Sequence, residues 1–292
     1  MEKINFYLLN QKGYSVLKEF TKKYGAEYVG NVIIGVDVNI QNDYSNEIKE
    51  ICIENNINYY YRNDIIPINN NYTFAIGWRW IIKQCEKLIV LHDSILPRYR
   101  GFAPLVNSII NGEEYLGVTA LFASEEYDRG DIINQKTVKI EYPIKINDAI
   151  DKVSDLYEEI VIEVSKQIIN KGEFHIEKQA ESRATYSLWR DKDDYFINWN
   201  DSSERIKRFI DALGYPYDGA KCMIKNNEIT IEDVTIINDV KIENRHIGKV
   251  IFFDNGKPVI VCAKGLIRID VAKYSESQKS IFPLNKFRIR FE

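Results

Sequence analysis

A histidine at the end of an apolar run is the first residue of the chain that could do chemistry. The run Leu88–Leu91 is followed directly by His92 and then by a polar loop that contains Pro97 and Gly101. In open α/β sheets, binding and catalytic sites form at the carboxyl ends of strands. The chain has only three histidines. The position of His92 alone leaves both a functional and a structural role open.

Asp128 lies in a second polar cluster, the acidic segment Glu125–Ile132. The spacing of that segment alone is typical of a solvated acidic turn. The adjacent residues His92, Asp93 and Ser94 cannot form a hydrolase relay among themselves, because neighbours on a strand point to opposite faces. The chain also lacks the GxSxG, GxGxxG and P-loop motifs, so hydrolase, dinucleotide and P-loop phosphate sites are not supported.

Alternating strands and helices have to position these residues. Short apolar runs alternate with helical patterns through the first half, which predicts a Rossmann-like, mostly parallel sheet with helices on both faces. The expected strands are Ile4–Leu9, Val32–Val36, Asn58–Tyr61, Thr73–Ile76, Leu88–Leu91 and Gly117–Phe122, and the expected helices are Tyr14–Tyr24, Asn46–Asn55 and Asn147–Ile169.

The second half of the chain changes character after a polar stretch, Lys171–Arg183. An amphipathic pattern predicts a helix over Asp201–Leu213, and short β-rich runs follow it. Asp254-Asn255-Gly256-Lys257 separates two of these runs and predicts a hairpin. We therefore expect a first domain over residues 1–178, and over residues 179–292 a helix with a smaller antiparallel, OB-like β domain.

Composition excludes several classes of protein. The 292 residues include 39 Lys+Arg and 43 Asp+Glu, which gives a net charge of −4. Proteins that bind nucleic acid usually carry an excess of basic residues. No apolar run approaches the ~20 residues that span a bilayer, and the start does not read as a signal peptide. Four scattered cysteines and three histidines predict no metal site. We expect a cytoplasmic protein without membrane, metal or nucleic-acid partner.

Taken together, the motifs around His92 and Asp128 resemble those of the 10-formyltetrahydrofolate-dependent formyltransferases. His-x-Ser-x-Leu-Pro-x-Tyr-Arg-Gly begins at His92, Gly-Val-Thr at Gly117, and Asp-x-Gly-Asp-Ile at Asp128. Each motif alone is weak, but the combination is specific. The resemblance covers most of the chain, since further matches lie at Asn111–Glu113, Ala184–Tyr186, Ile197–Trp199 and Pro216–Ala220.

The resemblance implies that His92 and Asp128 are catalytic, with Asp128 orienting and charging the histidine. The family also has an Asn two residues before this histidine, where it stabilises the oxyanion of formyl transfer. That position is Val90 here, which offers no donor. Another group could substitute, and Asn107 is one candidate; alternatively, the enzyme is slow, or it has lost activity and only binds.

The resemblance also implies the binding residues and the formyl donor, 10-formyltetrahydrofolate, with no metal. The pterin ring would lie between Ile76, Gly77, Trp78 and Arg79 on one side and Ser124, Glu126 and Tyr127 on the other. The acceptor substrate would be held by Ser94, Arg98, Tyr99, Arg100 and Gly101, since arginine suits phosphate. The alternative roles are packing of the tryptophans at the sheet edge and ion pairs of the arginines with Asp131 or Glu113.

Three sequence segments most resemble those of the bacterial nucleotide-sugar N-formyltransferases: Ile76–Trp78, Gly101–Asn107 and Ser187–Asp191. That likeness implies a UDP- or dTDP-linked amino-deoxysugar as acceptor, in the synthesis of surface glycans such as lipopolysaccharide O-antigen. A methionyl-tRNA or peptide-directed formyltransferase stays open. So does a degenerate ligand-binding homologue, because of Val90, and a homodimer is also left open.

Overall fold

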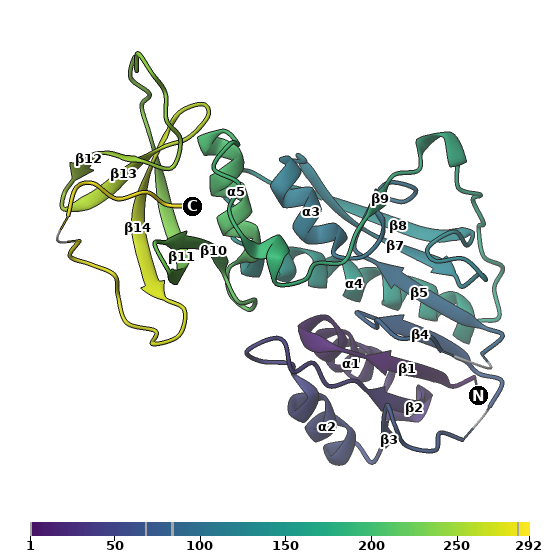
Figure 1. Ribbon diagram of the computed structural model, residues 1–292. Coiled ribbons are helices and arrows are strands. Elements are labelled where there is room, and N and C mark those ends of the chain that lie inside the picture. The colour runs from purple at the N-terminus through teal and green to yellow at the C-terminus, as the bar shows by residue number, and fades with distance from the viewer. Residues whose placement is uncertain (1, 68, 83–84, 285) are drawn as a thin grey trace. The chain divides into compact units, whose positions relative to one another are not determined.

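The computed structural model describes residues 2–67, 69–82, 85–284 and 286–292 and divides into two compact units (Figure 1). The first unit contains residues 1–105, 114–140 and 148–188, and the second contains residues 106–113, 141–147 and 189–292. The chain thus passes into the second unit at residues 188–189, ten residues beyond the boundary that the sequence suggests. Two short segments of the first half also belong to the second unit.

The first unit is built on a seven-stranded sheet in the order β3-β2-β1-β4-β5-β7-β8. The first five of these strands run parallel, and β7 and β8 are antiparallel to their neighbours. A mostly parallel sheet is thereby confirmed. The strands are β1 (Ile4–Leu8), β2 (Val29–Ile34), β3 (Asn58–Tyr61), β4 (Tyr72–Ile76), β5 (Leu88–His92), β7 (Tyr115–Phe122) and β8 (Ile132–Lys139).

Helices α1 (Asn10–Tyr24), α2 (Ser45–Glu54) and α4 (Ile146–Ile169) accompany this sheet. Helix α1 packs on α2 and receives a contact from α4, since the Tyr24 hydroxyl donates to Ile162 O. Helix α1 therefore lies against both α2 and α4. Their buried faces follow helical spacing, as with Val16, Leu17 and Phe20 of α1.

A short two-stranded ladder pairs β6 (Arg100–Gly101) with β9 (Tyr186–Ser187). It ties the loop after β5 to a segment about ninety residues further along the chain. Three short 3-10 helices also lie within the described residues: Ala26–Tyr28, Glu181–Arg183 and Asp193–Tyr195.

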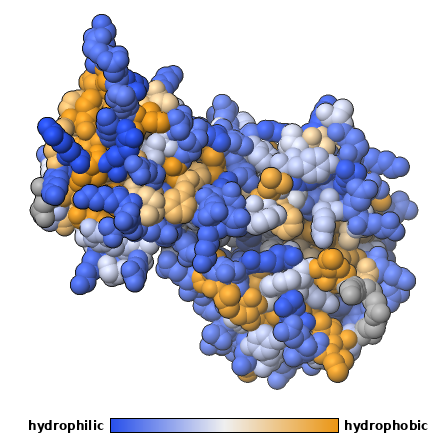
Figure 2. Space-filling view, in the orientation of Figure 1, coloured by the Kyte–Doolittle hydropathy of each residue, from blue (hydrophilic) through white to orange (hydrophobic). Residues whose placement is uncertain are grey.

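The second unit holds a five-stranded antiparallel sheet in the order β10-β11-β14-β13-β12. The predicted small β domain and its Asn255-Gly256 hairpin are thus present. Figure 2 shows apolar side chains gathered over this sheet, where several large ones are exposed. The elements are α3 (Pro104–Asn111), α5 (Ser203–Leu213), β10 (Ala220–Ile224), β11 (Asn227–Ile237), β12 (Val250–Asp254), β13 (Lys257–Val261) and β14 (Leu266–Tyr274).

Within the described ranges, none of the helices combines the length and apolar character that a membrane crossing requires. The same residues contain no group of three or more His, Cys, Asp and Glu side chains placed to hold a metal ion.

Candidate active site

His92 is the last residue of β5, at the carboxyl end of the parallel part of the sheet. Its strand lies between β4 and β7: Leu91 is paired with Ile76 on one side, and His92 with Thr119 on the other. The side chain is only 8% exposed. The apolar strand therefore carries the histidine to the edge where α/β sheets place their ligands, as the sequence predicts.

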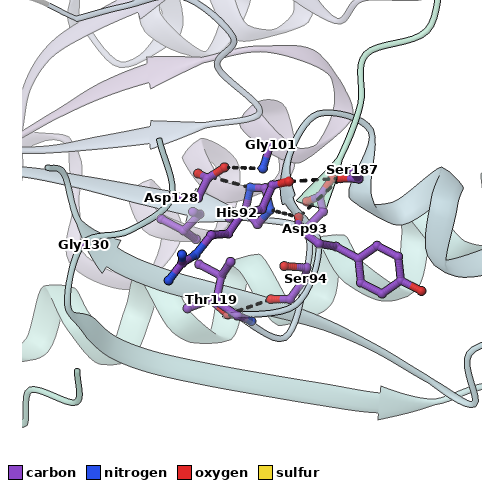
Figure 3. A network of polar contacts seen from close by, with 12 residues as sticks. His92, Asp93, Ser94, Gly101, Thr119, Asp128, Gly130 and Ser187 are labelled. Atoms are coloured by element: carbon purple, nitrogen blue, oxygen red, sulfur yellow. Dashed lines mark hydrogen bonds and ion pairs between the residues drawn. The ribbon is translucent and has the colours of Figure 1, made fainter. Parts of the chain in front are cut away.

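Both nitrogens of the His92 imidazole face oxygen atoms (Figure 3). Nε2 lies 2.8 Å from Tyr99 O, and since a carbonyl oxygen only accepts, Nε2 carries a proton. Nδ1 lies 3.5 Å from Asp128 Oδ1. Nδ1 is therefore the ring nitrogen that faces the carboxylate.

Asp128 is held in place from several directions. Its Oδ2 accepts a hydrogen bond of 2.8 Å from the Gly101 N–H. The Gln179 side-chain amide donates to Asp128 O at 2.7 Å and to Gly130 O at 2.8 Å. The residue adopts a left-handed backbone conformation, with φ at 56°. The Asp-x-Gly motif is thus a fixed turn that presents the carboxylate to His92.

The loop after His92 is closed by its own side chains. Ser94 Oγ donates to Arg98 O at 2.7 Å, while Thr119 Oγ1 donates to Ser94 O at 2.7 Å and accepts the Leu96 N–H at 3.2 Å. Ser94 is buried, so the serine of the motif holds the loop. Tyr99 stands in the left-handed region, and its N–H donates to Thr185 Oγ1 at 2.9 Å.

Arg100 lies differently from the sequence-based expectation for it. The side chain is completely buried, and its guanidinium donates to Gln179 Oε1 at 2.8 Å and to the Glu181 carboxylate at 2.7 and 3.0 Å. The bonds to Glu181 raise the pKa of Arg100 further. The partner is thus Glu181, not Asp131 or Glu113, and Arg100 anchors the segment that also positions Asp128. Arg98, by contrast, is exposed and lies over the Tyr99 ring at 5.2 Å.

The segment Ile76–Arg79 follows β4, the strand next to His92. Gly77 has φ at 61°, and a Cβ there would lie 3.0 Å from Leu9 O, so the tight turn requires glycine. The Trp78 ring packs against Tyr7 at 5.0 Å. Its buried Nε1 has no hydrogen-bond partner among the described residues. Arg79 pairs with the buried carboxylate of Asp37.

The opposite loop, Ser124–Tyr127, is exposed along its length. Ser124 Oγ donates to Glu126 O at 2.7 Å, and the Glu126 carboxylate pairs with Arg129 at 2.6 Å. The Tyr127 ring lies 6.4 Å from that of Phe102, which is also exposed. Two aromatic side chains therefore stand in solvent next to the His92–Asp128 pair.

Val90, at the position of the family's asparagine, and Asn107, the candidate substitute for it, have different surroundings. Val90 packs against a buried apolar cluster of Leu96, Leu121 and Ile132, so this position is filled by an apolar contact. Asn107 lies in the second unit, where its Oδ1 accepts a hydrogen bond of 2.6 Å from Arg190. The role of Asn107 as an oxyanion donor stays a prediction.

Three residues near His92 escape sequence reasoning: Lys12, Asp93 and Tyr157. The Asp93 carboxylate pairs with Lys12 and accepts a hydrogen bond of 2.5 Å from the Tyr157 hydroxyl. Asp93 stands inside the His92 motif, but its partners lie 81 and 64 residues away. The one indication in the sequence was a charged residue, Lys12, shortly after the first strand; the structure places it in the first turn of α1.

Comparison with known families assigns nearly the whole chain. The model of the formyl transferase family matches residues 13–165, more than half of the chain, and the model of the formyl transferase C-terminal domain matches residues 190–286. The sequence is 30% identical to methionyl-tRNA formyltransferase of Thermotoga neapolitana over 66% of this chain and 60% of the relative. For the Fusobacterium nucleatum enzyme the figures are 32%, 64% and 59%. The match thus spans about 60% of these relatives' length.

Solved structures share the fold over almost the entire chain. WlaRD, a sugar 3N-formyl transferase crystallised in the presence of dTDP and 5-N-formyl-THF, has a TM-score of 0.69 at 24% identity and covers 98% of this chain and 99% of its own. The N-formyltransferase from Helicobacter canadensis, in complex with folinic acid and dTDP-3-aminofucose, has a TM-score of 0.70 at 21% identity, over 92% and 99%. By its sequence motifs, its match to both family models and its fold, the chain belongs to the formyl transferase family.

Proposed function

We propose that this chain transfers the formyl group of 10-formyltetrahydrofolate to the amine of a nucleotide-linked amino-deoxysugar. The observation that carries the proposal is the His92–Asp128 pair at the end of β5, with Nδ1 facing the carboxylate at 3.5 Å. Membership of the formyl transferase family supports the reaction type.

In the proposed reaction, the amine nitrogen forms a bond to the formyl carbon, and the bond from that carbon to folate N10 breaks. His92 Nδ1 takes the proton that the amine loses and returns it to N10, because Nε2 already donates to Tyr99 O. Asp128 Oδ1 stabilises the charged imidazole, while the Gly101 N–H fixes the other carboxylate oxygen. General acid–base catalysis of this kind contributes about 10²–10⁴-fold in rate.

The residues next to His92 fit a folate. Trp78 offers a buried indole N–H that no described group accepts, and a pterin ring carries acceptors for it. Tyr127 and Phe102 present exposed aromatic faces on the other side. When bound there, 10-formyltetrahydrofolate supplies the formyl group. We assign its contacts to Ile76, Gly77, Trp78 and Arg79, and to Ser124, Glu126 and Tyr127.

The acceptor class is inferred from fold and charge. Both solved structures described above are N-formyltransferases whose crystals contain dTDP or a dTDP-linked sugar, and a net charge of −4 does not favour an RNA ligand. Arg98 and Tyr99 are the side chains we assign to a UDP- or dTDP-linked substrate. Arg100 contributes by holding the loop. The product would enter surface glycan synthesis, in a cytoplasmic enzyme.

Methionyl-tRNA is the second candidate acceptor, because the curated relatives described above are methionyl-tRNA formyltransferases. An enzyme of that kind would bind tRNA with strong salt dependence. A sugar enzyme would show no such dependence.

The experiment is release of tetrahydrofolate from 10-formyltetrahydrofolate with a panel of UDP- and dTDP-linked 3- and 4-amino sugars, with initiator methionyl-tRNA, and with no acceptor. We expect turnover with one sugar and none with tRNA. Turnover with tRNA alone would establish the second candidate. Release without acceptor would indicate hydrolysis, and silence from folate-loaded protein would indicate a binding protein.

A further inference from the structure

The chain on either side of His92 is held by a side chain of α4. Asp93 follows His92 directly, just beyond the end of β5, and its carboxylate contacts side chains of α1 and α4, whereas His92 Nδ1 faces Asp128. The Tyr157 hydroxyl, on α4, lies 3.1 Å from Leu91 O and 2.5 Å from Asp93 Oδ1. One buried hydroxyl thus contacts both residues that flank the histidine.

A charged pair completes this arrangement. Lys12, on α1, pairs with the Asp93 carboxylate, and the two side chains are only 13% and 15% exposed. The Lys12 ammonium also lies 5.6 Å from the centre of the Tyr157 ring. Three elements that are distant in the sequence therefore meet behind His92 within the first unit.

Holding the strand does not by itself require charge. Burying an ion pair costs desolvation energy that its attraction often fails to recover, and a neutral amide at position 93 could accept the same hydroxyl. What the charges add is a field at the neighbouring imidazole. Asp93 and His92 interact electrostatically, and Lys12 balances the carboxylate.

We propose that Lys12, Asp93 and Tyr157 form a positioning network for His92. Tyr157 fixes the strand end, and the Lys12 ammonium compensates the charge of the Asp93 carboxylate beside the imidazole. The charged groups that act on His92 come from three directions: Asp128 from the loop after β7, Asp93 from the loop that begins after β5, and Lys12 through Asp93. The inference rests on the proposed role of His92 as the group that moves the proton.

The network is tested by its charge. Asp93→Asn leaves the Lys12 ammonium unpaired behind His92, which disfavours the imidazolium. We expect the acidic limb of kcat/KM against pH to move to lower pH by about 0.5–1 unit. The double variant Lys12→Met/Asp93→Asn removes both charges and should return the limb to its wild-type position. A purely structural defect would not be reversed by a second substitution.

Two further variants separate position from charge. Tyr157→Phe keeps the packed ring and loses the hydroxyl, so kcat should fall about 10-fold with KM little changed and the limb unmoved. Lys207→Met is the matched control: it breaks the pair with Asp211 in the second unit, whose side chains are 16% and 2% exposed, and should leave the limb unmoved.

The histidine can also be followed directly. The imidazole NMR signal that is missing in His92→Ala identifies His92 among three histidines. Its titration midpoint should shift downwards in Asp93→Asn and return in the double variant. This reading holds even if no acceptor gives turnover, so failure of the proposed function and failure of the network are distinguishable. An unmoved midpoint in Asp93→Asn, or wild-type kcat in Tyr157→Phe, would overturn the proposal.

Discussion

Gly130 is the position where a single methyl group should disturb the His92–Asp128 pair most. A Cβ at Gly130 would lie 1.6 Å from Phe122 O, and Cβ atoms essentially never approach another atom within 3.0 Å. Gly130→Ala therefore requires a backbone movement of about 1.4 Å. The movement cannot be confined to Gly130, because the Phe122 N–H donates to Asp131 O at 3.0 Å and Gln179 donates to both Asp128 O and Gly130 O.

The movement should be felt as lost alignment of Asp128 with His92. A misplacement of about 1 Å in a catalytic arrangement can cost about 10²-fold, equivalent to about 2.7 kcal/mol in the barrier. The overpacking should also lower the free energy of unfolding by about 1–3 kcal/mol. We therefore expect Gly130→Ala to remain folded, with kcat/KM for formyl transfer reduced about 100-fold.

The assay is tetrahydrofolate release at fixed pH, with the melting temperature of each variant measured in parallel. Gly172→Ala is the matched control, since a Cβ there meets its nearest atom, Gln167 O, at 3.7 Å. Gly172→Ala should leave both kcat/KM and the melting temperature almost unchanged. Full activity in Gly130→Ala would refute the claim that this turn sets the position of Asp128.

The remaining predictions concern single side chains. His92→Ala and Asp128→Ala should each lower kcat by about 10²–10⁴-fold. Val90→Ala should lower the melting temperature and leave kcat within a few fold, because Val90 packs in an apolar cluster. Equal losses of kcat in all three variants would contradict the roles assigned to His92 and Asp128. Arg100→Met should lower the free energy of unfolding, measured in urea, by about 1–3 kcal/mol because the bonds to Gln179 and Glu181 are lost. Arg98→Ala should instead raise KM for the acceptor. A raised KM with unchanged stability in Arg100→Met would show that Arg100 binds substrate. Burial alone raises the pKa of Asp93, but Lys12, Tyr157 and His92 together hold that pKa below its ordinary value of 3.8. The ionised Asp93 therefore stabilises the folded protein above pH 3.8, and this stabilisation is lost as pH falls through the lower, folded-state pKa. The acid loss of stability should therefore be smaller in Asp93→Asn than in wild type, and equal slopes of stability against pH would contradict this.

Local pattern was sufficient for the elements that carry the site. The apolar run that ends in His92 and the Asp-x-Gly turn both have their signature within a few residues, and the structure brings the two side chains to 3.5 Å. Strand β8 is absent from the predicted strands because Asn134, Gln135 and Lys136 interrupt its apolar pattern. The same segment pairs with β7 because β7 offers it a buried neighbour.

Long-range partners were beyond the reach of pattern. The motif around Arg100 predicts a phosphate ligand, but the structure pairs Arg100 in the interior with Glu181, which lies 81 residues further along the chain. The Lys12–Asp93–Tyr157 network likewise joins three elements whose proximity only the folded sheet creates. The motifs thus supplied the candidate residues, and only the fold shows which of them are held in the interior by distant partners.

Analysis of the acceptor product is the sharpest test of the proposed formyl transfer. A dTDP-linked 3-amino sugar is incubated with 10-formyltetrahydrofolate and either wild-type protein or His92→Ala, and the sugar nucleotide is analysed by mass spectrometry. We expect a product heavier by one formyl group with wild type, and unchanged substrate with His92→Ala. Formylated sugar formed equally by both proteins would show that His92 is not needed for the transfer.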